Sequence, residues 1–84
     1  MHLALLNNGA TGSYHYVKMG QDHALSLEGE RSGKELTLQE FDENGRNTGR
    51  FSGRLTDRGV YEGTWVRRGG GTTLPFSLRV TTEW

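Results

Sequence analysis

Histidine is the first residue type in this chain that could hold a metal or move a proton. The imidazoles are those of His2, His15 and His23, and the chain has no cysteine, which removes thiolate metal sites and disulfides. A hairpin would bring His15 near His23, but no carboxylate stands at a recognisable ligand spacing from them. We therefore expect surface histidines, no metal site and no cofactor.

Glu40 is the carboxylate with the most unusual expected position. It follows Leu36 and Leu38 at alternate positions, so in a strand its side chain shares their inward face. A carboxyl group inside a small barrel must be paired, protonated or near a wet rim. Catalysis would need a second acid, a base or a nucleophile aimed at the same cavity, and the inward positions offer only tyrosine hydroxyls. We predict a structural Glu40, hydrogen-bonded to a tyrosine or an arginine near the barrel end, and no enzyme activity.

Arginines concentrate around one expected hairpin pair. Arg46, Arg50 and Arg54, together with Asn44 in the hairpin loop, are the candidates for an anion-binding or partner-binding patch. Neighbouring acidic residues would pair with these arginines across strands; they are Glu28, Glu40, Asp42, Glu43, Asp57 and Glu62. The pattern favours a solvated, cross-paired face, with these four residues as the partner-binding candidates.

Short strands must position all of these residues, because apolar side chains recur at every second position between glycine-bearing turn signals. The clearest turn is Glu-Asn-Gly-Arg-Asn at 43–47. We expect about seven strands, near 2–6, 11–18, 23–28, 35–42, 48–55, 60–67 and 72–82. No segment has a helical period with caps. The sequence predicts an all-β fold: an antiparallel up-and-down meander that forms a strongly curled sheet or a small barrel.

One face of this sheet is apolar and forms the expected core. Its inward residues are Leu3, Leu5, Tyr14, Tyr16, Leu25, Leu27, Leu36, Leu38, Phe51, Leu55, Tyr61, Trp65, Leu74, Phe76, Leu78 and Val80. We expect Trp65 to be buried beside Gly63 and Gly53, because glycine in a strand often marks the close approach of a ring.

Length and charge limit the classes of function. The 84 residues form a single domain, 1–84, which buries only roughly 60–65% of its unfolded surface. Ten basic and ten acidic residues cancel, whereas nucleic-acid binding normally demands a basic excess. No apolar run approaches the roughly 20 residues of a membrane span. The starting run Met-His-Leu-Ala-Leu-Leu is too short for a signal peptide and lacks a basic start. We expect neither nucleic acid nor a membrane span.

Four short motifs follow one another along the second half of the chain. They are Leu36-x-Leu38-x-Glu40, Gly49-x-Phe51-x-Gly53, Gly63-x-Trp65 and Leu74-Pro75-Phe76-x-Leu78. With them, the chain resembles small, mostly uncharacterised bacterial extracytoplasmic β-meander modules of secreted proteins and lipoproteins, over about residues 11 to 80. The resemblance implies that fold and a periplasmic or secreted setting, and it brings no catalytic residues.

These observations indicate a non-enzymatic binding or structural module with an unidentified protein partner. One alternative is an inhibitor of a cell-wall hydrolase that presents the loop at 43–47. Another is a small-ligand-binding barrel, ranked lower because the inward aromatic and leucine side chains are expected to leave little cavity.

The ends of the chain bear on assembly. A meander leaves its first and last strands as edges unless they pair with each other. The last strand is apolar-patterned, and Pro75 within it lacks an amide donor, which suits an edge position. We expect a homodimer formed through the terminal strands.

Overall fold

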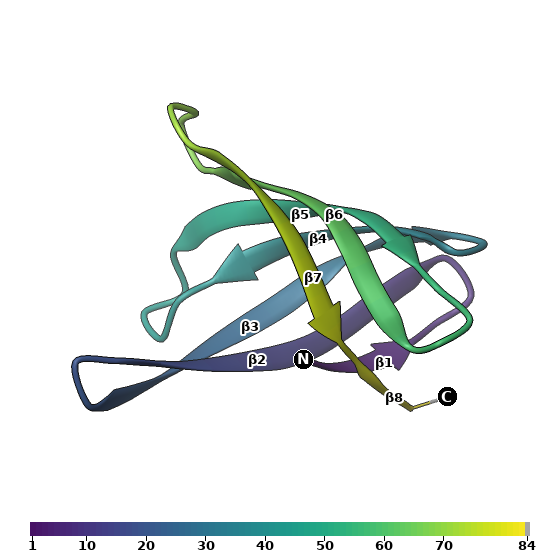
Figure 1. The fold of residues 1–84 in the computed structure, drawn as a ribbon, viewed down its shortest axis with the longest axis horizontal. Helices are drawn as coiled ribbons and strands as arrows, with labels where there is room; N and C mark the ends of the chain where they lie inside the picture. The colour runs from purple at the N-terminus through teal and green to yellow at the C-terminus, as the bar shows by residue number, and fades with distance from the viewer. Residues whose placement is uncertain (84) are drawn as a thin grey trace.

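Eight β-strands, with no helix among the described residues, make up the protein in this computed structural model, which describes residues 1–83 and only the backbone of 16–18, 22 and 83. The strands are β1 (His2–Leu5), β2 (Gly9–Lys18), β3 (Gln21–Ser32), β4 (Glu35–Phe41), β5 (Asn47–Leu55), β6 (Val60–Arg67), β7 (Thr73–Arg79) and β8 (Thr81–Glu83). Consecutive strands from β1 to β7 pair antiparallel in one strongly curled half-barrel sheet (Figure 1). The predicted all-β, curled meander is confirmed. Membrane-spanning helices are absent from the part of the chain that the structure describes.

The chain has one more strand than expected because its last segment breaks at Val80. The strand order is β7-β6-β5-β4-β3-β2-β1-β8, and β8 pairs with β1 in parallel. At the break, the Val80 amide donates to the Gly59 carbonyl at 2.8 Å, whereas the next amide, that of Thr81, donates to the Met1 carbonyl at 2.9 Å. The hydrogen bonds thus change sides between consecutive residues. As a result, β7 and β8 lie at opposite ends of the sheet although they are neighbours in sequence.

One end of the half-barrel is filled by side chains. This end carries the turns at 6–8, 33–34 and 56–59, on the right in Figure 1. Leu3, Leu38 and Tyr61 are fully buried there. The Tyr61 hydroxyl donates to the Leu36 carbonyl at 2.6 Å, and burial raises the pKa of Tyr61 above its ordinary value.

The expected inward face is largely confirmed. The buried apolar residues are Leu3, Leu5, Ala10, Leu25, Leu27, Leu36, Leu38, Phe51, Tyr61 and Val80, of which only Ala10 was not expected. Five others are partly buried against this core: Tyr14, Leu55, Trp65, Phe76 and Leu78. Leu74 is 51% exposed, because it lies on β7 at the end of the sheet. The side chain of Tyr16 lies outside the described residues.

The prediction that Trp65 lies beside Gly63 and Gly53 was wrong. Gly53 and Gly63 lie directly opposite each other in β5 and β6. A Cβ on Gly53 would overlap the carbonyl of Glu62, so these glycines allow two backbones, rather than a ring, to approach closely. The Trp65 indole packs against Gly49 instead.

Candidate functional site

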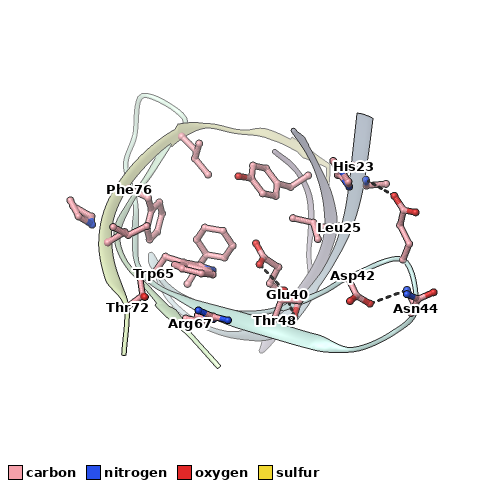
Figure 2. Close-up of a pocket in the computed structure, with 17 residues that line it drawn as sticks. His23, Leu25, Glu40, Asp42, Asn44, Thr48, Trp65, Arg67, Thr72 and Phe76 are labelled. Carbon is pink, nitrogen blue, oxygen red and sulfur yellow. Dashed lines mark hydrogen bonds between the residues drawn. The ribbon is translucent and has the colours of Figure 1, made fainter. Parts of the chain in front are cut away.

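A cavity of about 1060 Å³ occupies the other end of the half-barrel. Three hairpins surround its mouth: β2–β3, β4–β5 and β6–β7, on the left in Figure 1. Leu25, Phe51, Trp65 and Phe76 form much of its apolar wall, and Glu40 is the buried polar residue that lines it (Figure 2). The expectation that aromatic and leucine side chains leave little cavity was therefore wrong at this end.

The cavity remains open because Trp65 lies flat against the sheet. A Cβ on Gly49 would come within 2.6 Å of the indole Nε1 and Cε2 atoms, so the ring rests directly on the Gly49 backbone. Gly49 is directly opposite Glu40 in β4 and Arg67 in β6. With no side chain at this inward position, the ring lies along the wall and leaves the centre open (Figure 2).

Glu40 is held inside by a hydroxyl that a β-bulge supplies. The β4–β5 register shifts between Glu40, which faces Gly49, and Phe41, which faces Asn47. Thr48 is the extra residue between them, and a bulge of this kind re-aims a side chain. The Thr48 Oγ1 donates to Glu40 Oε1 at 2.7 Å. The predicted inward Glu40 is found, 6% exposed, but its partner is Thr48 rather than the expected tyrosine or arginine.

The Trp65 indole nitrogen is another polar atom of the site, and the described residues offer it no partner. The Trp65 Nε1 is buried and makes no hydrogen bond in the described part of the chain. The Glu40 carboxylate thus accepts no hydrogen bond from this donor, although the two side chains lie on the same side of the cavity (Figure 2).

Aromatic rings in edge-to-face contact form the floor of the cavity. The Phe51 and Phe76 ring centroids lie 4.9 Å apart at 86°, and the Tyr14 and Phe51 centroids lie 6.0 Å apart at 83°. Phe76 also contacts the buried ring of Tyr61, at 4.8 Å. This cluster separates the filled core from the cavity and leaves ring surface available to a ligand.

The β4–β5 loop forms a compact part of the rim. The Asp42 Oδ1 accepts from the amides of Asn44 at 2.9 Å and Arg46 at 3.0 Å, and Gly45 takes the positive φ of 79° that closes the turn. The Glu43 Oε1 accepts from the Ala24 amide of β3 at 3.3 Å. Both rim carboxylates therefore hold the loop in place.

The arginine candidates do not converge on the cavity. Arg50 and Arg54 are exposed on β5, where Arg54 lies directly opposite Glu35 and Glu62 in the neighbouring strands. Arg46 is exposed in the β4–β5 turn, while Asn44 lines the cavity rim. The structure thus separates the four candidates into a strand pair and a loop pair.

The histidines do not converge either. His15 pairs with Ala24 and is exposed, whereas His23 is one register position away and lines the cavity. Neighbouring register positions point to opposite faces of a sheet, so the two imidazoles lie on different sides. Among the described residues, no group of three or more metal-ligating side chains is present.

The sequence contained part of the signal for this site. Glu40 and Gly49 both fall on the inward phase, and a glycine opposite a carboxylate indicates open space beside it. Thr48 falls on the outward phase, so only the bulge brings it to Glu40. No family model, curated protein or solved structure matches this chain.

Proposed function

We propose that the protein is a non-enzymatic binding module that takes a small, partly apolar molecule into the mouth of its half-barrel. The observation that carries the proposal is the cavity of about 1060 Å³ with an aromatic wall and a buried carboxylate. Ligand sites are typically concave, mostly apolar and furnished with a few fixed polar groups. This arrangement meets each of those conditions.

Binding explains the polar groups better than catalysis does. Asp42 and Glu43 use their carboxylates to hold the rim loop, which leaves Glu40 as the buried carboxylate of the cavity. General acid–base chemistry needs at least one further group positioned on the same reacting atom. A single fixed carboxylate in an aromatic cavity orients a ligand.

A fluorescence titration with N-phenyl-1-naphthylamine, a neutral apolar dye, tests this proposal. We expect its fluorescence to rise as the cavity takes it up. Leu74→Gln should weaken binding by about fivefold because it removes apolar surface from the rim. Leu6→Gln is the matched control, since Leu6 is 56% exposed against 51% for Leu74 but does not line the cavity. Absence of dye binding, or equal effects of both variants, would refute the proposal.

The β4–β5 loop supports a second candidate, the inhibitor of a cell-wall hydrolase. Its turn is closed by the two bonds to Asp42, so exposed Asn44 and Arg46 are presented on a preorganised loop, and preorganisation favours tight binding. An Asn44→Ala/Arg46→Ala variant should lose inhibition of a peptidoglycan hydrolase in a turbidity assay. If the parent protein itself does not inhibit the hydrolase, this candidate is removed.

The motif resemblance alone supports a bacterial periplasmic or secreted setting.

We also infer a homodimer, now limited to one edge. β1 is paired on both sides, with β2 and β8, whereas among the described strands β7 pairs with β6 alone, and the Arg79 carbonyl at its end accepts from the Met1 amino group at 3.4 Å. Leu74 adds exposed apolar surface to that edge. Light scattering across a concentration series should show a dimer. Ser77→Pro, which adds a second proline to β7 beside Pro75, should weaken that dimer. A monomeric mass at the highest concentration would contradict it.

A further inference from the structure

Glu40 is a buried carboxylate with bonding capacity left over. Its side chain is 6% exposed, and among the described residues Thr48 is the only group that donates to it, at 2.7 Å. No described lysine or arginine forms an ion pair with it. A carboxylate offers about four acceptor positions, and a buried one is normally paired with a cation. No described residue supplies such a cation to Glu40.

The surroundings of Glu40 suit a cation from outside. Tyr14, Phe51, Trp65 and Phe76 line the same cavity, and ring faces attract ammonium groups, most strongly where water is excluded. Figure 2 shows the Glu40 carboxylate pointing inward, toward the ring cluster. A cation beside it would therefore meet both the carboxylate and aromatic surface.

The charges around the cavity also favour a positively charged ligand. Glu40, Asp42 and Glu43 line it, against Arg67 as the one arginine among its lining residues. The whole chain is neutral, with ten basic and ten acidic residues, so this negative balance is local to the mouth. A local field of this kind raises the concentration of oppositely charged ligands.

We propose that the cavity binds a small organic primary amine in its ammonium form. The ammonium donates to the carboxylate of Glu40, and the apolar body of the ligand lies against Phe51 and Phe76. This assignment rests on the proposed binding function and names its ligand class. It also gives Glu40 a purpose that the fold does not, because the hydrogen bond from Thr48 holds the carboxylate in one orientation before the ligand arrives.

Calorimetric titration with three probes of equal chain length tests the assignment: hexylammonium, hexan-1-ol and hexanoate. We expect hexylammonium to bind roughly tenfold more tightly than hexan-1-ol, as for one charge-assisted hydrogen bond, and hexanoate to bind most weakly. Glu40→Gln keeps the size of the side chain and an oxygen that can accept from Thr48. In this variant hexylammonium and hexan-1-ol should bind with about equal affinity, and the affinity for hexan-1-ol should be the same as in the parent protein. Glu62→Gln, the same change at an exposed position on β6, should leave the preference intact.

The outcomes separate the ligand class from the binding function. Equal binding of all three probes, or a preference for hexanoate, would overturn the ammonium assignment and keep the binding function. Binding of none of them would overturn both. Tighter binding of Nα-acetyl-lysine N-methylamide than of hexylammonium would overturn the small-molecule source, since the ammonium would then belong to a protein side chain.

Discussion

At the scale of single residues, burial of Glu40 costs free energy that burial of its neighbours on β4 does not. Burying a carboxylate costs free energy unless hydrogen bonds or a cation compensate, and among the described residues the Glu40 carboxylate receives one hydrogen bond, from Thr48. Leu36 and Leu38, on the same face of β4, are buried with no such cost. The fold would therefore gain from an apolar residue at position 40, which agrees with the proposed role of the carboxylate in binding.

Glu40→Leu should consequently leave the free energy of unfolding unchanged or raise it by up to about 1 kcal/mol. The same variant should lose the preference for hexylammonium. Urea denaturation measures the first effect. A loss of more than about 2 kcal/mol would show that the carboxylate is structural, as the sequence pattern alone predicted.

Tyr61 is the residue through which pH acts on the core. Burial raises the pKa of Tyr61 in the folded state above the unfolded value of about 10. The contribution of neutral Tyr61 to the free energy of unfolding is therefore full below about pH 10 and is lost as the pH rises beyond it. Tyr61→Phe should cost about 1 kcal/mol at pH 7, since it removes the bond to the Leu36 carbonyl. It should also flatten the decline in stability between about pH 10 and 11. Equal declines in both proteins, measured by urea denaturation, would rule out this role.

At the scale of the elements, alternation along the strands predicted the sheet and nearly all of its inward residues. Two local irregularities could not be predicted in this way. The break at Val80 depends on the Met1 carbonyl accepting from Thr81, and the bulge at Thr48 depends on register between β4 and β5. The break involves residues far apart in the chain, and the bulge involves a residue on the outward phase. An alternation of apolar and polar residues carries information on neither. The bulge is what completes the site.

Gly49→Ala tests how β5 and β6 keep the cavity open. The added Cβ would come within 2.6 Å of the Trp65 indole, so the ring must move off the wall. We expect a loss of about 1–3 kcal/mol in stability from overpacking. Binding of N-phenyl-1-naphthylamine should weaken as well, because the displaced indole enters the cavity. Unchanged stability and unchanged dye binding would show that the ring does not rest on Gly49.

At the scale of the whole molecule, the half-barrel is divided into a filled end and an open end. Tyr61, Leu3 and Leu38 close the first, while Gly49 and the flat Trp65 leave the second open. A chain of 84 residues has a small core and limited stability. The open end contributes less buried apolar surface than a filled core would, and binding of a ligand there would add stability.

The most direct test of this division is a ¹⁵N-resolved NMR titration with hexylammonium. Trp84→Phe leaves Trp65 as the single indole, since the chain has two tryptophans. We expect the largest shifts at the amides of Leu25 and Glu40 and at the Trp65 indole, while the amides of Leu3 and Tyr61 at the filled end stay unchanged. Shifts centred on Arg50 and Arg54, or no shifts at saturating amine, would contradict the claim that the open end is the binding site.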